Sequence, residues 1–208
     1  MIELISRPNL YLNYSQAPSI GYDSSKDEDI IDVSGGVLHL NLASREEKME
    51  LHKRVMFREL QCLFHNLGLE DLLVFGASDL PWRFREKKYK EARVRRIMKS
   101  FATFGLKPRF SGAVKVPVSE LWPWFRDVLY CVRVNALVQE MFFMDTTESV
   151  FFSPCQYGNV HITVLTTGAA RKFKKFLLTS PLVTLDSRNC GSELYNRGPI
   201  PGRQSTYY

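Results

Sequence analysis

The sequence predicts a single α+β domain in which an antiparallel or mixed sheet packs against two or three long helices. Three observations lead to this fold class. Short segments of alternating apolar residues, typical of half-buried strands, occur along the chain between longer segments whose apolar residues recur every three or four positions, typical of helices. The chain has 208 residues, of which 45% are hydrophobic and 24% are charged. A chain of this size and composition buries a substantial core in one domain.

The composition also divides the chain into three parts. Residues 1–34 are polar, contain Pro8 and Pro18, and carry an acidic run, so we expect a flexible polar and acidic N-terminal arm. Residues 35–190 carry the strand and helix patterns and are predicted to form the globular α+β domain. Residues 191–208 are polar and are predicted to form a flexible C-terminal tail.

The first part of the domain is predicted to contain a strand and a long helix. Alternating leucines predict a strand over residues 37–42. Ser44 and Glu47 have the spacing of a capping box, so we expect a helix that begins there and ends before Gly68. The short apolar run 69–75 is compatible with either a helical turn or a strand, and a loop follows it.

Two more helices are predicted in the middle of the domain. Apolar residues spaced by three and four predict an amphipathic helix over residues 86–104. A strand is expected over residues 112–118, where Pro117 indicates an edge position. Ser119 is expected to cap a mostly buried helix that extends to Met141.

The last part of the domain alternates strands and one short helix. Strands are predicted over residues 150–152 and 159–166, a helix over 169–178, and a last strand over 182–185.

Nothing in the sequence predicts catalysis or a bound cofactor. The four cysteines, at positions 62, 131, 155 and 190, are too far apart for a compact zinc motif. The sequence contains no nucleophile elbow, zinc-protease helix, P-loop or dinucleotide-binding fingerprint. We therefore expect a protein that is not an enzyme and that binds no metal or other cofactor. The remaining enzyme hypothesis requires His39 or His161 to lie in a pocket beside a carboxylate.

The positive charge is concentrated in one segment. The whole chain has a formal net charge of +6. Residues 83–99 contain nine basic and two acidic residues, so this segment alone has a net charge of +7. A second cationic segment lies in the predicted helix 169–178. Like charges at this density repel one another unless they meet an anionic partner. We therefore predict that an anionic surface is bound by Arg83, Arg85, Lys87, Lys88, Lys90, Arg93, Arg95, Arg96, Lys99, Arg171, Lys172, Lys174 and Lys175. Trp82, Phe84 and Tyr89 lie among the basic residues and are predicted to be interface aromatics.

Two kinds of anionic partner fit this distribution. An anionic membrane surface attracts Lys and Arg and accepts exposed aromatics at its interface. RNA or DNA would exchange counterions for the same side chains. Because no known nucleic-acid-binding motif occurs, the second possibility is contact with the backbone without sequence preference.

The arrangement of these segments resembles that of rhabdovirus-type viral matrix proteins over roughly residues 35–185. The resemblance depends on a strand followed by a helix, on the basic amphipathic segment 93–105, and on the run 157–165, which is similar to the family's C-terminal strand. It implies a structural protein of the virion that binds the inner face of the membrane, self-associates and condenses the viral nucleocapsid or RNA. It also implies a location in the host cytoplasm or nucleus and possible contacts between the N-terminal arm and host proteins. Family members usually begin with a lysine-rich arm and a budding motif, whereas this arm is acidic and Tyr14–Ser19 is neither budding motif.

The alternative function is a small viral nucleic-acid-binding regulator, such as an RNA-silencing suppressor or a movement factor. Preference for RNA over anionic vesicles would distinguish this alternative from the matrix-like function.

Overall fold

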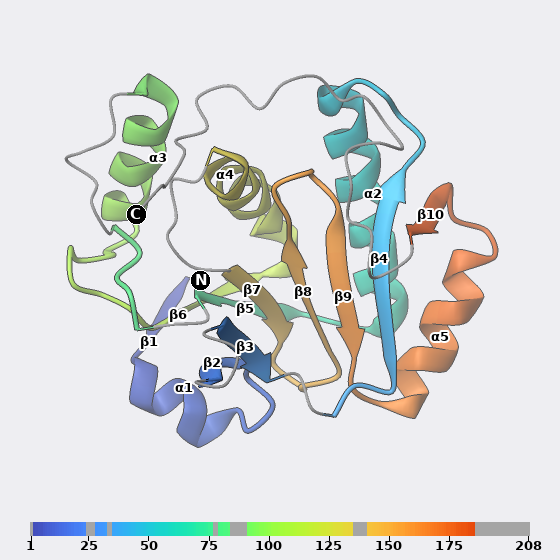
Figure 1. The fold of residues 1–208 in the computed structure, drawn as a ribbon, viewed down its shortest axis with the longest axis horizontal. Helices are drawn as coiled ribbons and strands as arrows, with labels where there is room; N and C mark the ends of the chain where they lie inside the picture. Colours follow the sequence, from blue (N-terminus) through green and yellow to red (C-terminus); the bar gives the residue numbers. More distant parts are fainter. Residues whose placement is uncertain are drawn as a thin grey trace.

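A computed structural model describes residues 2–23, 28–32, 35–76, 79–83, 91–134 and 141–185 of the chain (Figure 1). Eight strands form one antiparallel sheet in the order β1-β6-β5-β7-β8-β9-β4-β10, and β2 pairs with β3 in a separate hairpin. The strands are β1 (Glu3–Ile5), β2 (Ser19–Asp23), β3 (Glu28–Asp32), β4 (Leu38–Ser44), β5 (Asp71–Gly76), β6 (Ala113–Pro117), β7 (Met141–Asp145), β8 (Val150–Pro154), β9 (Val160–Val164) and β10 (Leu182–Leu185). The helices of the described residues are α1 (Arg7–Asn13), α2 (Met49–Leu67), α3 (Ala92–Thr103), the short 3-10 helix η2 (Val118–Glu120), α4 (Leu121–Arg133) and α5 (Thr167–Leu177). The predicted α+β fold class is confirmed.

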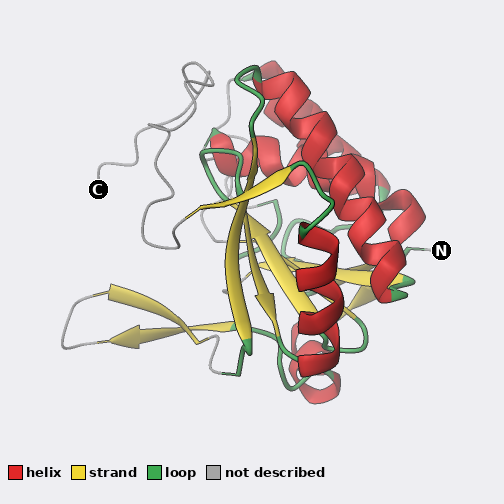
Figure 2. Cartoon of the chain, turned by 90° about the vertical axis from the view of Figure 1, so that its right-hand side faces the viewer, coloured by secondary structure: helices red, strands yellow, loops and turns green. Residues whose placement is uncertain are grey.

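The sheet separates two apolar layers of unequal size. Helices α2, α3, α4 and α5 cover one face, and their buried side chains form the larger core with residues such as Leu72, Phe143 and Phe152. Helix α1 covers part of the opposite face, where Leu10 is fully buried against Phe75 and Phe142. Figure 2 shows the long helices on one side of the sheet and the β2–β3 hairpin extending away on the other side.

The N-terminal segment corrects one sequence-based expectation. Residues 1–34 were expected to form a flexible arm, but β1 pairs with β6 at the edge of the main sheet and α1 buries Leu10 in the core. Pro8 lies in the first turn of α1, where a missing N–H group costs nothing. Ser6 caps this helix by accepting a hydrogen bond from the Asn9 amide at 3.4 Å. The expected C-terminal tail, 191–208, lies outside the described residues.

The expected capping box of the first long helix is wrong. Strand β4 continues through Ser44, because its backbone pairs with Leu182 of β10. The Ser44 hydroxyl lies 2.8 Å from His52 Nδ1, and α2 begins only at Met49 without a side-chain cap. Gly68 ends this helix in the left-handed conformation, as predicted.

Two further differences concern the middle of the domain. The helix expected from Ser119 to Met141 ends at Arg133, and Met141 begins β7, because a run of buried apolar residues does not by itself distinguish a helix from a central strand. Strand β6 is not an edge strand, since β1 and β5 flank it. However, β1 begins at Glu3, opposite Lys115, so Pro117 has a partner only on the β5 side. The run 69–75 forms strand β5.

Candidate anion-binding surface

Helix α3 carries the described part of the predicted basic segment. Its amino end is capped by Glu91, whose carboxylate accepts hydrogen bonds from the amides of Arg93 at 3.1 Å and Val94 at 2.7 Å. The apolar residues of α3 are buried, and its cations lie on the remaining faces, because the sequence has a period of three and four. Arg95, Arg96 and Lys99 are exposed and Arg93 is half-buried.

An aromatic cluster holds α3 against α4. Trp82 is fully buried, and its indole Nε1 donates to the Gly112 carbonyl at 2.8 Å. Its ring lies edge-on to Phe101 and Trp124 with centroid distances of 5.4 and 5.9 Å. The prediction that Trp82 is an interface aromatic is therefore wrong, because its side chain has no exposed surface and belongs to the core.

Several predicted site residues lie outside the described residues, so their prediction is not tested by the structure. They are Phe84, Arg85, Lys87, Lys88, Tyr89 and Lys90. Arg83 is described and is half-buried, and its guanidinium donates to the Leu106 carbonyl at 3.2 Å. One hydrogen bond of Arg83 therefore ties its loop to the segment that follows α3.

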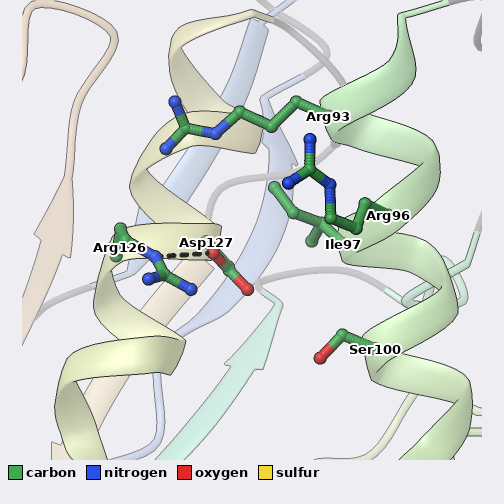
Figure 3. Close-up of a pocket in the computed structure, with 6 residues that line it drawn as sticks. All are labelled: Arg93, Arg96, Ile97, Ser100, Arg126 and Asp127. Carbon is green, nitrogen blue, oxygen red and sulfur yellow. Dashed lines mark hydrogen bonds and ion pairs between the residues drawn. The ribbon is translucent and has the colours of Figure 1, made fainter.

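A groove between α3 and α4 is lined by cationic side chains. Its cavity volume is about 340 Å³. Figure 3 shows that the α3 side chains extend toward α4 and that Arg126 extends into the space between the helices. The residues that line the groove are Arg93, Arg96, Ile97, Ser100, Arg126 and Asp127.

The groove is held in place by contacts around Tyr130. The guanidinium carbon of Arg93 lies 3.9 Å from the centroid of the Tyr130 ring. The Tyr130 hydroxyl in turn forms a hydrogen bond with Glu91, the cap of α3. Burial would raise the pKa of Glu91, but the hydrogen bonds from the Val94 and Arg93 amides and from Tyr130 keep this pKa below its usual value. Burial, followed by the nearby Glu91 carboxylate, raises the pKa of Tyr130. Near neutral pH, Glu91 therefore stays ionised and Tyr130 stays protonated, as the hydrogen bond between them requires.

Helix α5 forms a second cationic surface. The Thr166 hydroxyl caps this helix by accepting a hydrogen bond from the Ala169 amide at 3.2 Å. Phe173 and Phe176 pack into the core, which places the cations on the opposite side. All four cations are exposed, namely Arg171, Lys172, Lys174 and Lys175. Lys172 and Lys175 line a shallow groove of about 350 Å³ next to the end of α2, and Leu178 at the end of α5 is 85% exposed.

The two cationic helices lie on the same side of the sheet, at opposite ends of the helical layer (Figure 1). Neither α3 nor α5 contains an acidic residue. By contrast, α2 and α4 between them carry both signs of charge, which form the ion pairs Lys53–Glu50, Arg58–Glu59 and Arg126–Asp127. Helices α2 and α4 each have a net charge of +1, whereas α3 and α5 each have +4, so the positive charge of the helical layer is highest at its two ends.

Two residues with reactive side chains, His52 and Cys131, are buried inside the domain. His52 is fully buried between the Ser44 hydroxyl and the Gly158 carbonyl, at 2.8 and 2.6 Å. Burial raises the pKa of the Cys131 thiol, which keeps it protonated. Within the described ranges, no group of His, Cys, Asp or Glu residues could hold a metal ion, and no helix there is long and apolar enough to span a membrane. Neither groove is lined by His39 or His161.

Several residues of these surfaces were not predicted from the sequence, among them Ser100, Arg126, Asp127, Tyr130 and Leu178. Ser100 could have been found, since Arg93, Arg96 and Ser100 follow one another at helical spacings on one face. Leu178 could have been recognised as the residue that follows the last turn of a cationic helix. Arg126 and Tyr130 could not have been found, because only the packing of α4 brings them next to α3.

Comparisons with protein-family models, with curated proteins and with solved structures find no match to this chain. The resemblance to rhabdovirus-type matrix proteins stays a prediction.

Proposed function

We propose that this protein is a non-enzymatic docking protein, similar in role to a viral matrix protein, that binds an anionic membrane surface and self-associates there. The observation that supports the proposal is the pair of helices, α3 and α5, whose charged residues are all cationic and which lie on the same side of the sheet. We call the cations of these two helices the α3 patch and the α5 patch. A flat anionic surface is a partner that both patches can contact at once.

The binding free energy of a single cationic helix is too small for stable docking on a membrane. Each Lys or Arg near an anionic bilayer contributes about 1 kcal/mol, so the four cations of one helix give about 4 kcal/mol. Such a free energy corresponds to a dissociation constant of about 1 mM, which is weak. A second patch on the same domain binds intramolecularly once the first has bound, and this raises the overall affinity by a factor of about 100 or more. Self-association would multiply the number of patches further.

An exposed apolar side chain at the end of α5 supports a membrane as the partner. Leu178 is the most exposed large apolar residue of the described part of the chain, and it lies three positions after Lys175. An aliphatic side chain beside cations is suited to the interface between lipid headgroups and acyl chains.

Co-sedimentation with vesicles of phosphatidylcholine and phosphatidylserine tests the proposal, with single-stranded RNA measured in parallel over a salt series. We expect vesicle binding that weakens as salt increases, and a molecular mass by sedimentation that increases with protein concentration. A triple variant of α5, with Lys172, Lys174 and Lys175 changed to Glu, should abolish vesicle binding without lowering the melting temperature.

A matched variant controls for net charge. Arg45, Lys48 and Arg54 are exposed cations near the other end of α2, and changing these three to Glu alters the net charge of the chain by the same amount. This control should retain most of the vesicle binding. Equal losses in the two variants would show that only the total charge matters and would contradict a docking surface on α5.

The nucleic-acid regulator is the second candidate, and one observation favours it. The α3–α4 groove is lined by three arginines, whose planar guanidinium groups form paired hydrogen bonds with phosphate. Tight RNA binding with a steep salt dependence and no association with vesicles would select this candidate instead.

A further inference from the structure

The α3–α4 groove differs from an ordinary charged surface because its cations converge. Arg93 and Arg96 reach in from α3 and Arg126 from α4, so guanidinium groups approach one space from two helices (Figure 3). Arg93 also interacts electrostatically with the carboxylates of Glu91 and Glu50. Guanidinium groups that approach one space repel one another, and an anionic ligand between them would relieve this repulsion.

The groove suits an anion with several terminal oxygens. Its lining carries three guanidinium groups and the carboxylate of Asp127, and the carboxylates of Glu91 and Glu50 act on Arg93 from outside the lining. A phosphodiester presents two terminal oxygens, whereas a phosphomonoester presents three and carries a charge of about −1.5 to −2 near neutral pH. The monoester therefore offers more acceptors to guanidinium groups that come from two helices.

The available donors also suit a terminal phosphate. Asp127 accepts from Nε of Arg126 at 3.0 Å, which leaves the terminal nitrogens of that arginine for a ligand. The Tyr130 ring supports the face of the Arg93 guanidinium and leaves its N–H groups at the edge. Ser100 adds a hydroxyl to the same space. A volume of about 340 Å³ is at the small end of ligand pockets, sufficient for a phosphate and a short part of its ester group.

We propose that the α3–α4 groove is a binding site for a phosphomonoester dianion, presented either by a lipid headgroup or by a soluble phosphate ester. The proposal rests on the proposed function, because it names the lipid chemistry that the α3 end of the docking surface selects. Helix α5 contributes binding that depends on charge alone, and the groove contributes the selectivity.

The test in solution compares methyl phosphate with dimethyl phosphate, by calorimetric titration of the full chain at equal ionic strength. We expect the monoester to bind about tenfold more tightly, equivalent to about 1.4 kcal/mol. Lowering the pH from about 7.5 to about 5.5 should reduce this preference to about threefold, since with a second pKa of about 6 most of the phosphomonoester is then a monoanion. Equal affinities for the two esters, or no measurable binding of methyl phosphate, would overturn the proposal.

Variants locate the binding. Arg93→Ala and Arg126→Ala should each weaken methyl phosphate binding about tenfold, the typical loss of a charge-assisted hydrogen bond. Arg93→Lys keeps the charge but loses the planar pair of donors, so it should lose most of the preference for the monoester. Lys99→Ala removes an exposed cation from the same helix outside the groove and serves as the control. A loss in Lys99→Ala as large as in Arg93→Ala would contradict a defined site.

Vesicles distinguish the source of the phosphate and separate this proposal from the proposed function. Phosphatidic acid carries a phosphomonoester and phosphatidylglycerol a phosphodiester. Preference for phosphatidic acid that disappears in Arg93→Ala identifies a lipid headgroup, whereas monoester preference in solution with equal binding to both vesicles, adjusted to equal charge, identifies a soluble ester. Vesicle binding without any monoester preference in solution overturns only the groove. The absence of binding to both vesicle types overturns the proposed function, whatever methyl phosphate does.

Discussion

The two cationic helices have the same charge but differ in how they present it. Helix α3 carries three arginines and one lysine, and helix α5 carries one arginine and three lysines. Two of the α3 arginines, Arg93 and Arg96, line a groove with Arg126 of α4, and the Tyr130 ring of α4 supports Arg93. All four cations of α5 are exposed around the helix. Arginine fits planar, paired recognition of phosphate, whereas lysine acts as a mobile point charge. Equal charge therefore predicts different selectivity at the two ends of the helical layer.

The difference depends on how firmly each helix is fixed. Helix α3 is held by an aromatic cluster in which Phe101 stacks on Trp124 with a centroid distance of 5.7 Å and meets Trp82 edge-on. Helix α5 packs through Phe173 and Phe176 against α2 and the sheet. The groove needs the distance between α3 and α4 to be constant, since its guanidinium groups come from both helices. Binding through α5 has no such requirement, because one helix carries all the cations.

The largest expected effect comes from removing the support of α3. Phe101→Ala should lower the free energy of unfolding by about 3–5 kcal/mol, since Phe101 is 1% exposed and the surrounding rings cannot fill the cavity. The measurement is urea unfolding followed by tryptophan fluorescence. Thr103→Ala, an exposed change on the same helix, should alter stability by less than about 0.5 kcal/mol. A small effect of Phe101→Ala would mean that α3 is not held by this cluster and that the contrast with α5 is incorrect.

A smaller effect is expected at the cap of α3. Glu91→Gln should cost about 1 kcal/mol, because a neutral amide accepts the Arg93 and Val94 amide hydrogens less strongly than a carboxylate does. The folded-state pKa of Glu91 is below the ordinary value of 4.5. Its stabilisation is therefore fully present above about pH 5 and is lost as the pH falls through the folded-state pKa.

Unfolding curves of wild type and Glu91→Gln over a pH series test whether the stabilisation by Glu91 is lost as the pH falls. The difference between the two proteins should be constant near neutral pH and should shrink in acid. Glu47→Gln, at an exposed residue outside both helices, provides the comparison. If the difference in the free energy of unfolding between the two proteins grows as the pH falls, the ionised Glu91 carboxylate does not stabilise the fold. Glu91 would then not be the cap that fixes α3.

The sequence predicted the fold class well because the periodic patterns are strong. The strands around Leu40 and Ile162 and the helices around Ile97 and Phe173 lie where the apolar spacing placed them. The errors have physical causes. Met141 and its neighbours are buried on both faces of a central strand, where the alternation that marks a half-buried strand disappears.

For the candidate surface, charge could be predicted but geometry could not. The cations of α3 and α5 are visible in the sequence because they are near one another along the chain. Contacts between segments that are distant in sequence determine the rest. They bury Trp82 beside α3 and bring Arg126 into the same groove as Arg93. An aromatic residue among cations has the same pattern whether it faces the core or an interface, and this ambiguity explains the error at Trp82.

The smallest expected effect tests whether the α5 end touches lipid. Leu178 is 85% exposed, so Leu178→Ser should leave stability unchanged within about 0.5 kcal/mol. If Leu178 enters the interface beside Lys174 and Lys175, the same change should weaken binding to anionic vesicles about threefold, since part of one leucine side chain loses its apolar contact. Leu12 on α1 is 81% exposed on the opposite side of the sheet, which makes Leu12→Ser the matched control, with no expected loss. Equal vesicle binding by both variants would mean that α5 acts through charge alone, and a loss in Leu12→Ser only would place the membrane against the opposite face.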